Sequence, residues 1–360
     1  MKLGILGPPQ SGKTTLFAAL TRGQALAGSS RGETVHLGSV KVPDARLDHL
    51  RDLYQPKKFT PAKVDYVDAP PLETGRAERG ALAALAALRD VDAFVLVLRA
   101  FEDPAVPHFQ GSVDPARDAG WLLSELILED LALVERRLER IEKAVKVGKK
   151  PEDPNEYEAL KVVRAALESE RPARMAGLSK AGERALRGFQ LLSMRPWIVV
   201  VNADDAALKG GESALVAPVA ARFGAEAPPV IALSAKTEAE LVQLSDEDAR
   251  EFMSVLGIEE PGLTRMIRLS YATLGQISFF TVGPDEVRAW TVRDGSLAPE
   301  AAGAIHSDLE RGFIRAEVIA YDDLATSGGM PKARELGLLR TEGKDYRVRD
   351  GDVVNIRFSV

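Results

Sequence analysis

The feature that most constrains this chain is a glycine-rich octapeptide directly after a short apolar run. The run is Leu3-Gly4-Ile5-Leu6, and the octapeptide, Gly7 to Thr14, reads GPPQSGKT and has the spacing G-x-x-x-x-G-K-[ST]. Gly7 lets the chain leave a strand sharply, and Gly12 lets the backbone approach phosphate, so that N–H groups at a helix N-terminus point at one anion. The pattern therefore predicts a phosphate-binding loop between a strand and a helix.

Within this loop two side chains have predicted roles of their own. Lys13 would supply a cation for the outer phosphates, and Thr14 a hydroxyl for Mg²⁺. The alternative is a chance glycine turn before a helix, which does not explain the lysine and the hydroxyl. The residues expected to contact the phosphates are Gly7, Pro9, Gln10, Ser11, Gly12, Lys13, Thr14 and Thr15.

Composition places the chain among ordinary globular proteins. Its 360 residues are 45% hydrophobic and 28% charged, which predicts two or three domains. There is no cysteine, so disulfides and thiolate chemistry are excluded. The four histidines lie far apart in the sequence and lack metal-ligand spacing.

Location and partners are constrained by hydropathy and charge. No run approaches the ~20 apolar residues that cross a bilayer, and the N-terminal apolar run is too short for a signal peptide. We therefore expect a cytoplasmic protein with no membrane partner. The formal charge of −6 gives no global attraction to nucleic acid, so contact with RNA would require a local basic surface.

The N-terminal third alternates strand-like and helix-like segments, which predicts an α/β domain with a mostly parallel sheet and helices on both faces. A helix is expected over Lys13–Thr21. The expected strands are Leu3–Leu6, Val35–Val42, Lys63–Asp68, Ala93–Leu98, Trp197–Val201 and Pro229–Leu233. Because the last two strands follow a long helical segment, that segment is predicted to be an insertion in the α/β domain.

The inserted segment has the pattern of an antiparallel helical hairpin over 121–189. Apolar residues recur at steps of four and three in its first arm, and Gly148 and Pro151 end that arm. The seam residues are Ile127, Leu131, Val134, Leu138, Ile141 and Val145, answered by Leu160, Val163 and Leu167. Seven basic residues between Arg136 and Lys150 form either a solvated coiled-coil face or a contact surface for RNA or a ribosomal protein.

The C-terminal part is predicted to be a small all-β domain around one short helix. Its expected strands are Ile277–Val282, Val287–Val292, Phe313–Tyr321 and Arg347–Val360. The predicted domains are thus a discontinuous nucleotide-binding domain of 1–120 and 190–274, the hairpin of 121–189, and a C-terminal domain of 275–360.

The metal and switch positions follow the second strand of the phosphate site. Asp68 ends this strand and is the expected Mg²⁺ ligand together with Thr14, while Asp65 in mid-strand is the alternative. In guanine-nucleotide switches the aspartate opens D-x-x-G, but here Pro71 stands at the glycine position. Proline has no N–H, so it cannot donate the backbone hydrogen bond to the γ-phosphate.

Base recognition is predicted after two later strands. Asn202 and Asp205 match N-K-x-D, although Ala203 replaces the lysine, and Asp205 could accept from a purine's N–H groups. The alternative is an Asx-turn at a strand end. Ser234-Ala235-Lys236 resembles the loop that supports the base in the same superfamily.

Taken in this order, the motifs resemble those of the YchF family, a branch of the Obg-related P-loop proteins. The C-terminal part makes the resemblance specific, and it covers essentially the whole chain. The segments that carry it are Val42–Asp48, Phe279–Gly283, Glu286–Thr291, Ala301–His306 and Phe313–Asp323.

The resemblance implies a P-loop domain with a coiled-coil insertion and a C-terminal TGS domain of β-grasp type. It implies binding and slow hydrolysis of ATP or GTP with Mg²⁺, and association with the ribosome or structured RNA through the insertion and the TGS domain; we expect a monomer. Leu72 matches the family's hydrophobic residue in place of the catalytic glutamine. His108 matches a histidine assigned a catalytic role in a mobile loop, whereas a lone loop histidine is usually a surface residue.

Departures from the family pattern leave alternatives open. Gly32 stands near the expected Mg²⁺-binding threonine, with Thr34 as a substitute, and Asp205 stands where the family usually has glutamate. One interpretation is a slow ATPase or GTPase that regulates translation or stress responses. The other is a nucleotide-gated ribosome- or RNA-binding module with little hydrolysis. A P-loop kinase for a small metabolite would not explain the C-terminal part.

Overall fold

The computed structural model describes residues 1–23, 26–30, 33–70, 88–224 and 227–359. They form two compact units, each built from separate stretches of the chain. The first unit comprises 1–38 and 65–263, and the second comprises 39–64 and 264–360. The helical segment that the sequence analysis assigned to a domain of its own lies in the first unit, and residues 39–64 group with the C-terminal part.

The first unit contains a seven-stranded sheet in the order β2-β3-β5-β1-β6-β7-β8. The four pairings from β5 through β8 are parallel and β2 pairs antiparallel with β3, so the predicted mostly parallel sheet is confirmed. The strands are β1 Lys2–Leu6, β2 Leu26–Ser30, β3 Glu33–Lys41, β5 Lys63–Asp68, β6 Ala93–Ala100, β7 Trp197–Ala203 and β8 Val230–Leu233.

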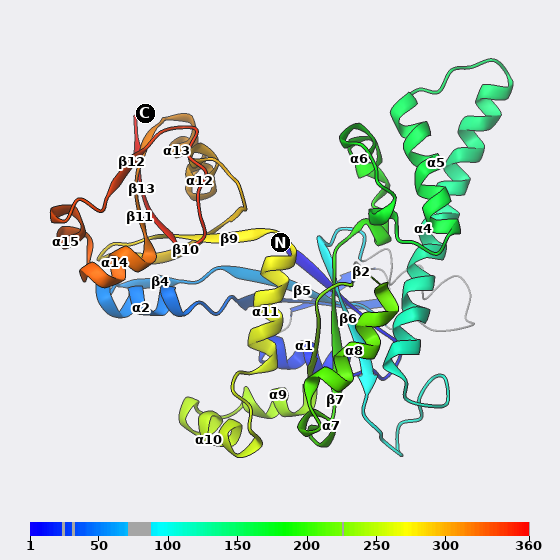
Figure 1. Ribbon diagram of the computed structural model, residues 1–360, viewed down its shortest axis with the longest axis horizontal. Coiled ribbons are helices and arrows are strands. Elements are labelled where there is room, and N and C mark those ends of the chain that lie inside the picture. The colour runs from blue at the N-terminus through cyan, green and yellow to red at the C-terminus, as the bar shows by residue number, and fades with distance from the viewer. Residues whose placement is uncertain (24–25, 31–32, 71–87, 225–226, 360) are drawn as a thin grey trace. The chain divides into compact units, whose positions relative to one another are not determined.

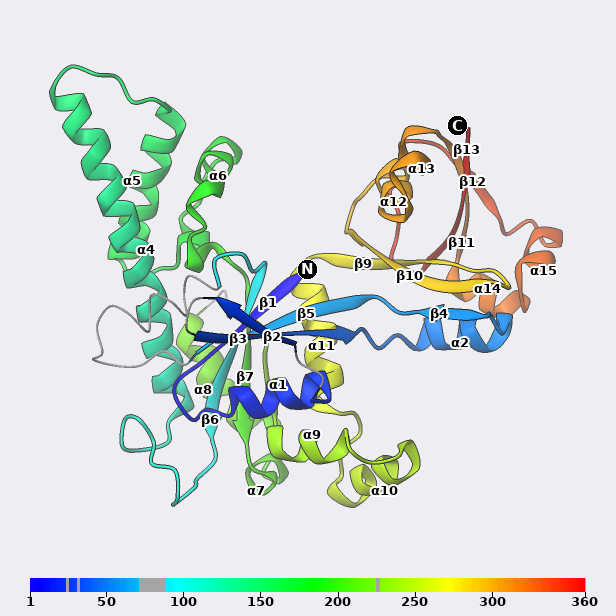
Figure 2. The same ribbon diagram turned by 180° about the vertical axis from the view of Figure 1, so that it is seen from behind.

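Helices cover both faces of this sheet. Alternate residues of β6, from Phe94 to Leu98, pack with apolar residues of α4 (Pro115–Lys146) and α8 (Glu212–Phe223). Figure 1 shows α8 on the near side of the sheet, and Figure 2 shows α1 (Lys13–Thr21) on the other side. Outside the helical hairpin and the segment that follows it, this unit also contains α7 Asp205–Lys209, α9 Ala235–Leu241 and α10 Asp246–Leu256. None of the described helices is long and apolar enough to cross a membrane.

The helical hairpin consists of α4 and α5 (Pro154–Glu168), which lie side by side in both views. Both helices begin with an aspartate N-cap followed by proline, an arrangement that favours helix starts. The predicted seam forms its core, except that Val145 is 40% exposed near the tip. After the hairpin, the chain forms one further helix, α6 Lys180–Leu186. It also forms three 3₁₀ turns, which are η1 Ala173–Met175, η2 Arg187–Phe189 and η3 Leu192–Met194.

The second unit is a six-stranded mixed sheet in the order β12-β11-β13-β9-β10-β4. Its strands are β4 Lys58–Thr60, β9 Gln276–Thr281, β10 Glu286–Arg293, β11 Phe313–Ala320, β12 Arg340–Glu342 and β13 Asp352–Phe358. Its helices are α2 Ala45–Tyr54, α11 Gly262–Thr273, α12 Ala298–Ile305, α13 Ser307–Arg311, α14 Tyr321–Ser327 and α15 Met330–Glu335. The prediction of one short helix after residue 275 was therefore wrong, since the structure has four there. The strand expected from Arg347 begins only at Asp352, after the turn at Gly351.

Residues 39–64 belong to this second unit through specific contacts. β4 adds to the sheet edge, where Glu286 pairs with Lys58 in parallel register. Arg46 donates to the carboxylates of Asp44 and Asp350, and its guanidinium lies over the ring of Phe280. Because Phe280 and Asp350 are far from Arg46 in the sequence, the local pattern that located β5 correctly could not reveal these contacts.

Candidate nucleotide-binding site

The predicted phosphate-binding loop connects β1 to α1, and both of its glycines are required by its geometry. A Cβ on Gly7 would lie 2.3 Å from the carbonyl oxygen of Val97 on the neighbouring strand. Gly12 has a φ of +89°, and a Cβ there would lie 2.1 Å from Nδ2 of Asn202. Any other side chain would therefore displace the loop or the residues packed against it.

Gly12 is also the N-cap of α1, and it carries no side chain that could satisfy the N–H groups of the first turn. Those donors therefore remain for an anion at the positive end of the helix dipole. The hydroxyl of Ser11 is buried and has no hydrogen-bond partner among the described residues. The loop thus presents unsatisfied donors in the place where the sequence predicted phosphate.

The amine of Lys13 is buried against the loop that precedes it. Its side chain is 5% exposed, and Nζ donates to the carbonyl oxygens of Gly7 at 3.0 Å and Pro8 at 2.8 Å. Burial lowers the pKa of Lys13 to about 8, against the opposing effect of the Asp68 carboxylate. A phosphate beside this amine would favour its charged form.

The carboxylate of Asp68 lies beside the start of α1. Oγ1 of Thr14 donates to Oδ2 of Asp68 at a long 3.3 Å, and Oδ1 is buried with no hydrogen-bond partner among the described residues. Burial raises the pKa of Asp68, opposed first by Lys13 and then by Thr14 and His36. Asp65, the alternative ligand, pairs with Lys2 at the opposite end of β1 from the loop. Mg²⁺ prefers hard oxygen ligands, and the Asp68 carboxylate, which has an unused oxygen, and the Thr14 hydroxyl are ligands of this kind.

Only part of a metal shell is present in the protein itself. Among the described residues no group of three His, Cys, Asp or Glu side chains could hold a metal ion. Magnesium commonly takes one or two protein ligands and completes its shell with phosphate oxygens and water. Thr14 and Asp68 therefore fit Mg²⁺ that arrives with a nucleotide.

Asn202 connects the phosphate loop to the predicted base-recognition loop. Its side chain is 5% exposed; Nδ2 donates to the carbonyl of Ser11 at 2.9 Å, and Oδ1 accepts from the N–H of Ala235 at 2.9 Å. A single amide thus holds together two segments that are more than thirty residues away from it on either side. An isolated Asx-turn would need neither contact.

Asp205 is held by a residue that the sequence analysis did not identify. Oγ1 of Thr237 lies 2.6 Å from Oδ1 of Asp205 and 2.9 Å from Oγ of Ser234, while Ser234 caps α9 by accepting from the N–H of Thr237. The threonine directly follows the Ser234-Ala235-Lys236 motif, which was the available signal. This network fixes the orientation of the Asp205 carboxylate, as an acceptor for a base requires.

His108 is not the exposed loop residue that its sequence context favours. Its side chain is 4% exposed, and Nδ1 accepts from the N–H of Gln110 at 3.1 Å. Nε2 lies 2.9 Å from Oδ2 of Asp118, in the first turn of α4. Nδ1 is therefore hydrogen-bonded within the protein, whereas Nε2 is in electrostatic contact with a buried carboxylate. Asp118 is a further residue that the sequence did not reveal.

Several predicted switch positions lie outside the described residues. They are Gly32, Pro71 and Leu72. Thr34 lies in β3, but its side chain is not among those described. The predictions attached to these positions stay predictions.

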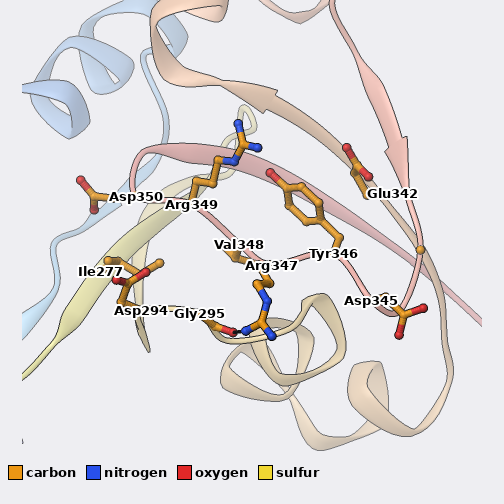
Figure 3. Close-up of a pocket in the computed structure, with 11 residues that line it drawn as sticks. Ile277, Asp294, Gly295, Glu342, Asp345, Tyr346, Arg347, Val348, Arg349 and Asp350 are labelled. Carbon is orange, nitrogen blue, oxygen red and sulfur yellow. Dashed lines mark hydrogen bonds between the residues drawn. The ribbon is translucent and has the colours of Figure 1, made fainter.

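A separate surface hollow of about 850 Å³ lies in the second unit and contains none of the predicted nucleotide contacts. Figure 3 shows Arg347 directed toward the carbonyl of Gly295, to which it donates at 2.9 Å, while Arg349 extends from the opposite side of the same segment. The two guanidinium groups do not converge, so this hollow lacks the geometry of an anion site.

Two family models match the chain. Residues 2–119 match a model described as a 50S ribosome-binding GTPase. Residues 276–359 match the model of the C-terminal domain of YchF GTPases, which is described as a protein of unknown function.

Full-length relatives are similar to the whole chain. It is 41% identical to the ribosome-binding ATPase YchF of Bacillus subtilis (strain 168), with 99% of each chain covered. It is 40% identical to the protein of that name from Haemophilus influenzae, over all of this chain and 99% of the relative. Among solved structures, the Schizosaccharomyces pombe YchF GTPase has a TM-score of 0.82 at 30% identity, over 99% of this chain and 97% of that one.

Proposed function

The chain belongs to the YchF family of P-loop proteins, and on that premise we propose that it binds a purine nucleotide with Mg²⁺, hydrolyses ATP or GTP slowly, and associates with the ribosome. The observation that carries the proposal is the double contact of Asn202. It holds the phosphate loop and the Ala235 segment at one site, so phosphate and base contacts would act on the same molecule. Ribosome association is proposed because relatives covering the whole chain are named for it.

The phosphates would be held by the loop and by the start of α1. The N–H groups that follow Gly12 point to the anion, and the amine of Lys13 neutralises its outer charge. Thr14 and Asp68 are the proposed ligands of Mg²⁺, which when bound would neutralise charge on the phosphate oxygens. The proposed phosphate contacts are Gly7, Pro9, Gln10, Ser11, Gly12, Lys13, Thr14 and Thr15.

The purine would lie against Asn202, Asp205, Ser234 and Ala235. Thr237 keeps the Asp205 carboxylate fixed, so its oxygens can accept from the N–H groups of a base without first being ordered. Relatives are named both as an ATPase and as a GTPase, and we propose purine binding without a preferred base.

Hydrolysis is the part of the proposal that depends on His108, which we propose as the group that assists the attacking water. One observation favours the second candidate, a nucleotide-gated ribosome-binding module with little turnover. Both ring nitrogens of His108 are engaged by Gln110 and Asp118, so neither faces a water until one contact is released.

The helical hairpin and the C-terminal TGS-like domain are the proposed ribosome- or RNA-contacting parts of a cytoplasmic monomer. Near the hairpin tip several basic side chains are exposed, whereas Arg137 is engaged by Glu156. Exposed positive charge of this kind would contact phosphate groups of RNA in a salt-dependent manner. The exposed basic residues are Arg136, Arg140, Lys143, Lys146, Lys149 and Lys150, of which Lys143 pairs with Glu139.

Two measurements test the proposed hydrolysis and the proposed ribosome association. They are single-turnover assays with ATP and with GTP, and cosedimentation of the protein with ribosomes. We expect product formation above the uncatalysed rate and a ribosome-bound fraction that changes with the nucleotide. Tight nucleotide binding without product would leave only the binding module. Cosedimentation that is the same with and without nucleotide would contradict gating in either form.

A further inference from the structure

The strongest unassigned feature of the first unit is the buried carboxylate of Asp118 beside His108. Asp118 is fully buried, and its Oδ2 lies 2.9 Å from Nε2 of His108. That oxygen has no partner with hydrogen-bond geometry among the described residues. The contact is therefore electrostatic as it stands.

The other oxygen of Asp118 is fixed by Arg117. Nε and Nη2 of Arg117 donate to Oδ1 at 3.1 and 2.9 Å, and the same guanidinium donates to the carbonyl and the hydroxyl of Ser112. The carboxylate is thus held in one orientation, with Oδ2 directed at the histidine. Because Oδ1 is already used twice, Oδ2 is the oxygen that has capacity left.

Capping of α4 does not explain Asp118. Asp114 is the N-cap of this helix, and its side chain accepts from the N–H of Arg117 at 2.9 Å. A second carboxylate buried four residues later makes no capping hydrogen bond and carries a desolvation cost, since burial raises the pKa of Asp118. The desolvation cost of the Asp118 carboxylate is offset by its contacts with Arg117 and His108.

The hydrogen bonds also assign the tautomer of His108. Nδ1 accepts from the N–H of Gln110, so Nδ1 carries the lone pair, and the ring proton is on Nε2, the nitrogen that faces Asp118. A ring with the proton on Nδ1 would place two hydrogens against each other at Gln110. Carboxylates that face the N–H of a histidine hold its tautomer and orientation in the same manner in hydrolytic enzymes.

We propose that Asp118 is a positioning residue for nucleotide hydrolysis, acting through His108; this rests on the proposed function in which His108 assists the attacking water. The carboxylate keeps the proton on Nε2, so Nδ1 is the basic atom. When the hydrogen bond from the N–H of Gln110 to Nδ1 breaks, a water molecule takes the place of that N–H and donates to Nδ1. The water oxygen bonds to the γ-phosphorus, the bond to the bridging oxygen breaks with its electron pair on the leaving diphosphate, and Nδ1 takes the water proton.

The kinetic test compares Asp118→Asn, His108→Ala and the double variant in single-turnover hydrolysis. We expect Asp118→Asn to lower the rate constant at least about 10-fold with nucleotide affinity unchanged, because a wrongly oriented or wrongly protonated base loses most of its effect. In the His108→Ala background the same substitution should have no further effect. Asp114→Asn is the matched control, since asparagine caps a helix as well as aspartate does.

A second measurement does not depend on turnover. The chain has four histidines, so a long-range ¹H–¹⁵N spectrum resolves each ring and His108→Ala assigns the relevant one. We expect the Nε2–H tautomer in the unsubstituted protein and a changed or mixed tautomer in Asp118→Asn. If Asp118→Asn does not fold, Arg117→Gln keeps both partners but frees Oδ1, and it should lower the rate constant at unchanged affinity.

Three outcomes would overturn the inference and are distinguishable from one another. An equal loss from Asp118→Asn with and without His108 would make Asp118 structural. An unaltered rate in His108→Ala would remove the histidine from hydrolysis. If the unsubstituted protein does not hydrolyse nucleotide at all, the proposed hydrolase function fails, whereas the spectrum still decides whether Asp118 sets the tautomer.

Discussion

Lys13 has its charged amine buried between two carbonyl oxygens of its own loop, and its pKa is lowered by that burial to about 8. In an unfolded chain the same amine has a pKa near 10.5. Between these two values the unfolded state binds more protons, so the Lys13 contribution to the stability of the nucleotide-free protein increases as the pH rises. Phosphate has the opposite preference, because it stabilises the protonated amine.

Nucleotide binding is therefore expected to take up a proton at Lys13 in mildly alkaline solution. At about pH 8.5 most of the amine is neutral before binding and charged after it, so more than about half a proton is taken up, whereas at about pH 7 this group contributes almost none. Calorimetric titrations in buffers of different ionisation enthalpy measure the uptake. Lys13→Arg is the control, because arginine stays protonated throughout. Equal uptake in the two proteins would contradict the assignment.

For single residues, the sequence predicted which polar side chains lie at the carboxyl ends of the parallel strands. Asp68 and Asn202 follow β-branched apolar strands, and such strand ends meet at one edge of a parallel sheet. The pairing of His108 with Asp118 could not be predicted in this way. It depends on how an irregular segment folds back onto the first turn of the following helix, and no periodicity describes that path.

Among the helices and strands, the long helix α4 is hydrogen-bonded to the segment before β7 through the carboxylate of Asp130. Asp130 is 3% exposed and accepts from the N–H of Leu192, the N–H of Ser193 and the hydroxyl of Ser193, at 2.6 to 2.8 Å. These contacts fix η3, the turn that leads toward a central strand. The anchor is polar although it lies beside an apolar core, and each of its oxygens is satisfied.

Asp130→Ala should lower the free energy of unfolding by about 3 kcal/mol, because it leaves two buried N–H groups without acceptors. Urea unfolding followed by circular dichroism measures the change. Glu135→Ala, at an exposed position of the same helix, should change the free energy of unfolding by less than about 0.5 kcal/mol. Equal effects of the two substitutions would show that the Asp130 contacts do not stabilise the fold.

Helices were predicted well where the repeating pattern of apolar residues was long enough to identify. The seam of α4 spans more than two heptads, from residue 127 to 145, and all its predicted residues except Val145 lie in the hairpin core. The helices α12 to α15 have eight residues or fewer, which is too short for a helical period to stand out against alternating strands. The three-residue strands β4 and β12 escaped prediction for the same reason.

At the scale of the whole molecule, residues 39–64 complete a unit to which they are remote in sequence. Without them β10 loses its parallel partner β4, and Asp350 loses the guanidinium of Arg46. Sequence patterns are local, so a domain boundary placed at residue 275 could not include this segment. Pairing between distant segments becomes visible only in three dimensions.

A fragment of residues 275–360 should therefore unfold at a lower temperature than one chain in which a flexible linker joins 39–64 to 264–360. The shorter fragment leaves the edge of β10 unpaired, and unpaired edges also promote aggregation. Thermal unfolding of the two fragments followed by circular dichroism makes the comparison. Fragments of equal stability would support the boundary at residue 275 and contradict a structural role for 39–64.

If the loop from Gly7 to Thr14 and the segment around Asn202 form one purine-nucleotide site, both must act on the same bound molecule, and a calorimetric titration measures this binding. ATP and GTP are each titrated, with and without Mg²⁺, into the unsubstituted protein and into Lys13→Ala. We expect one binding event per chain for at least one nucleotide, tighter with Mg²⁺ and weakened at least about 10-fold in Lys13→Ala. Equal affinity in the two proteins, or no binding of either nucleotide, would contradict it.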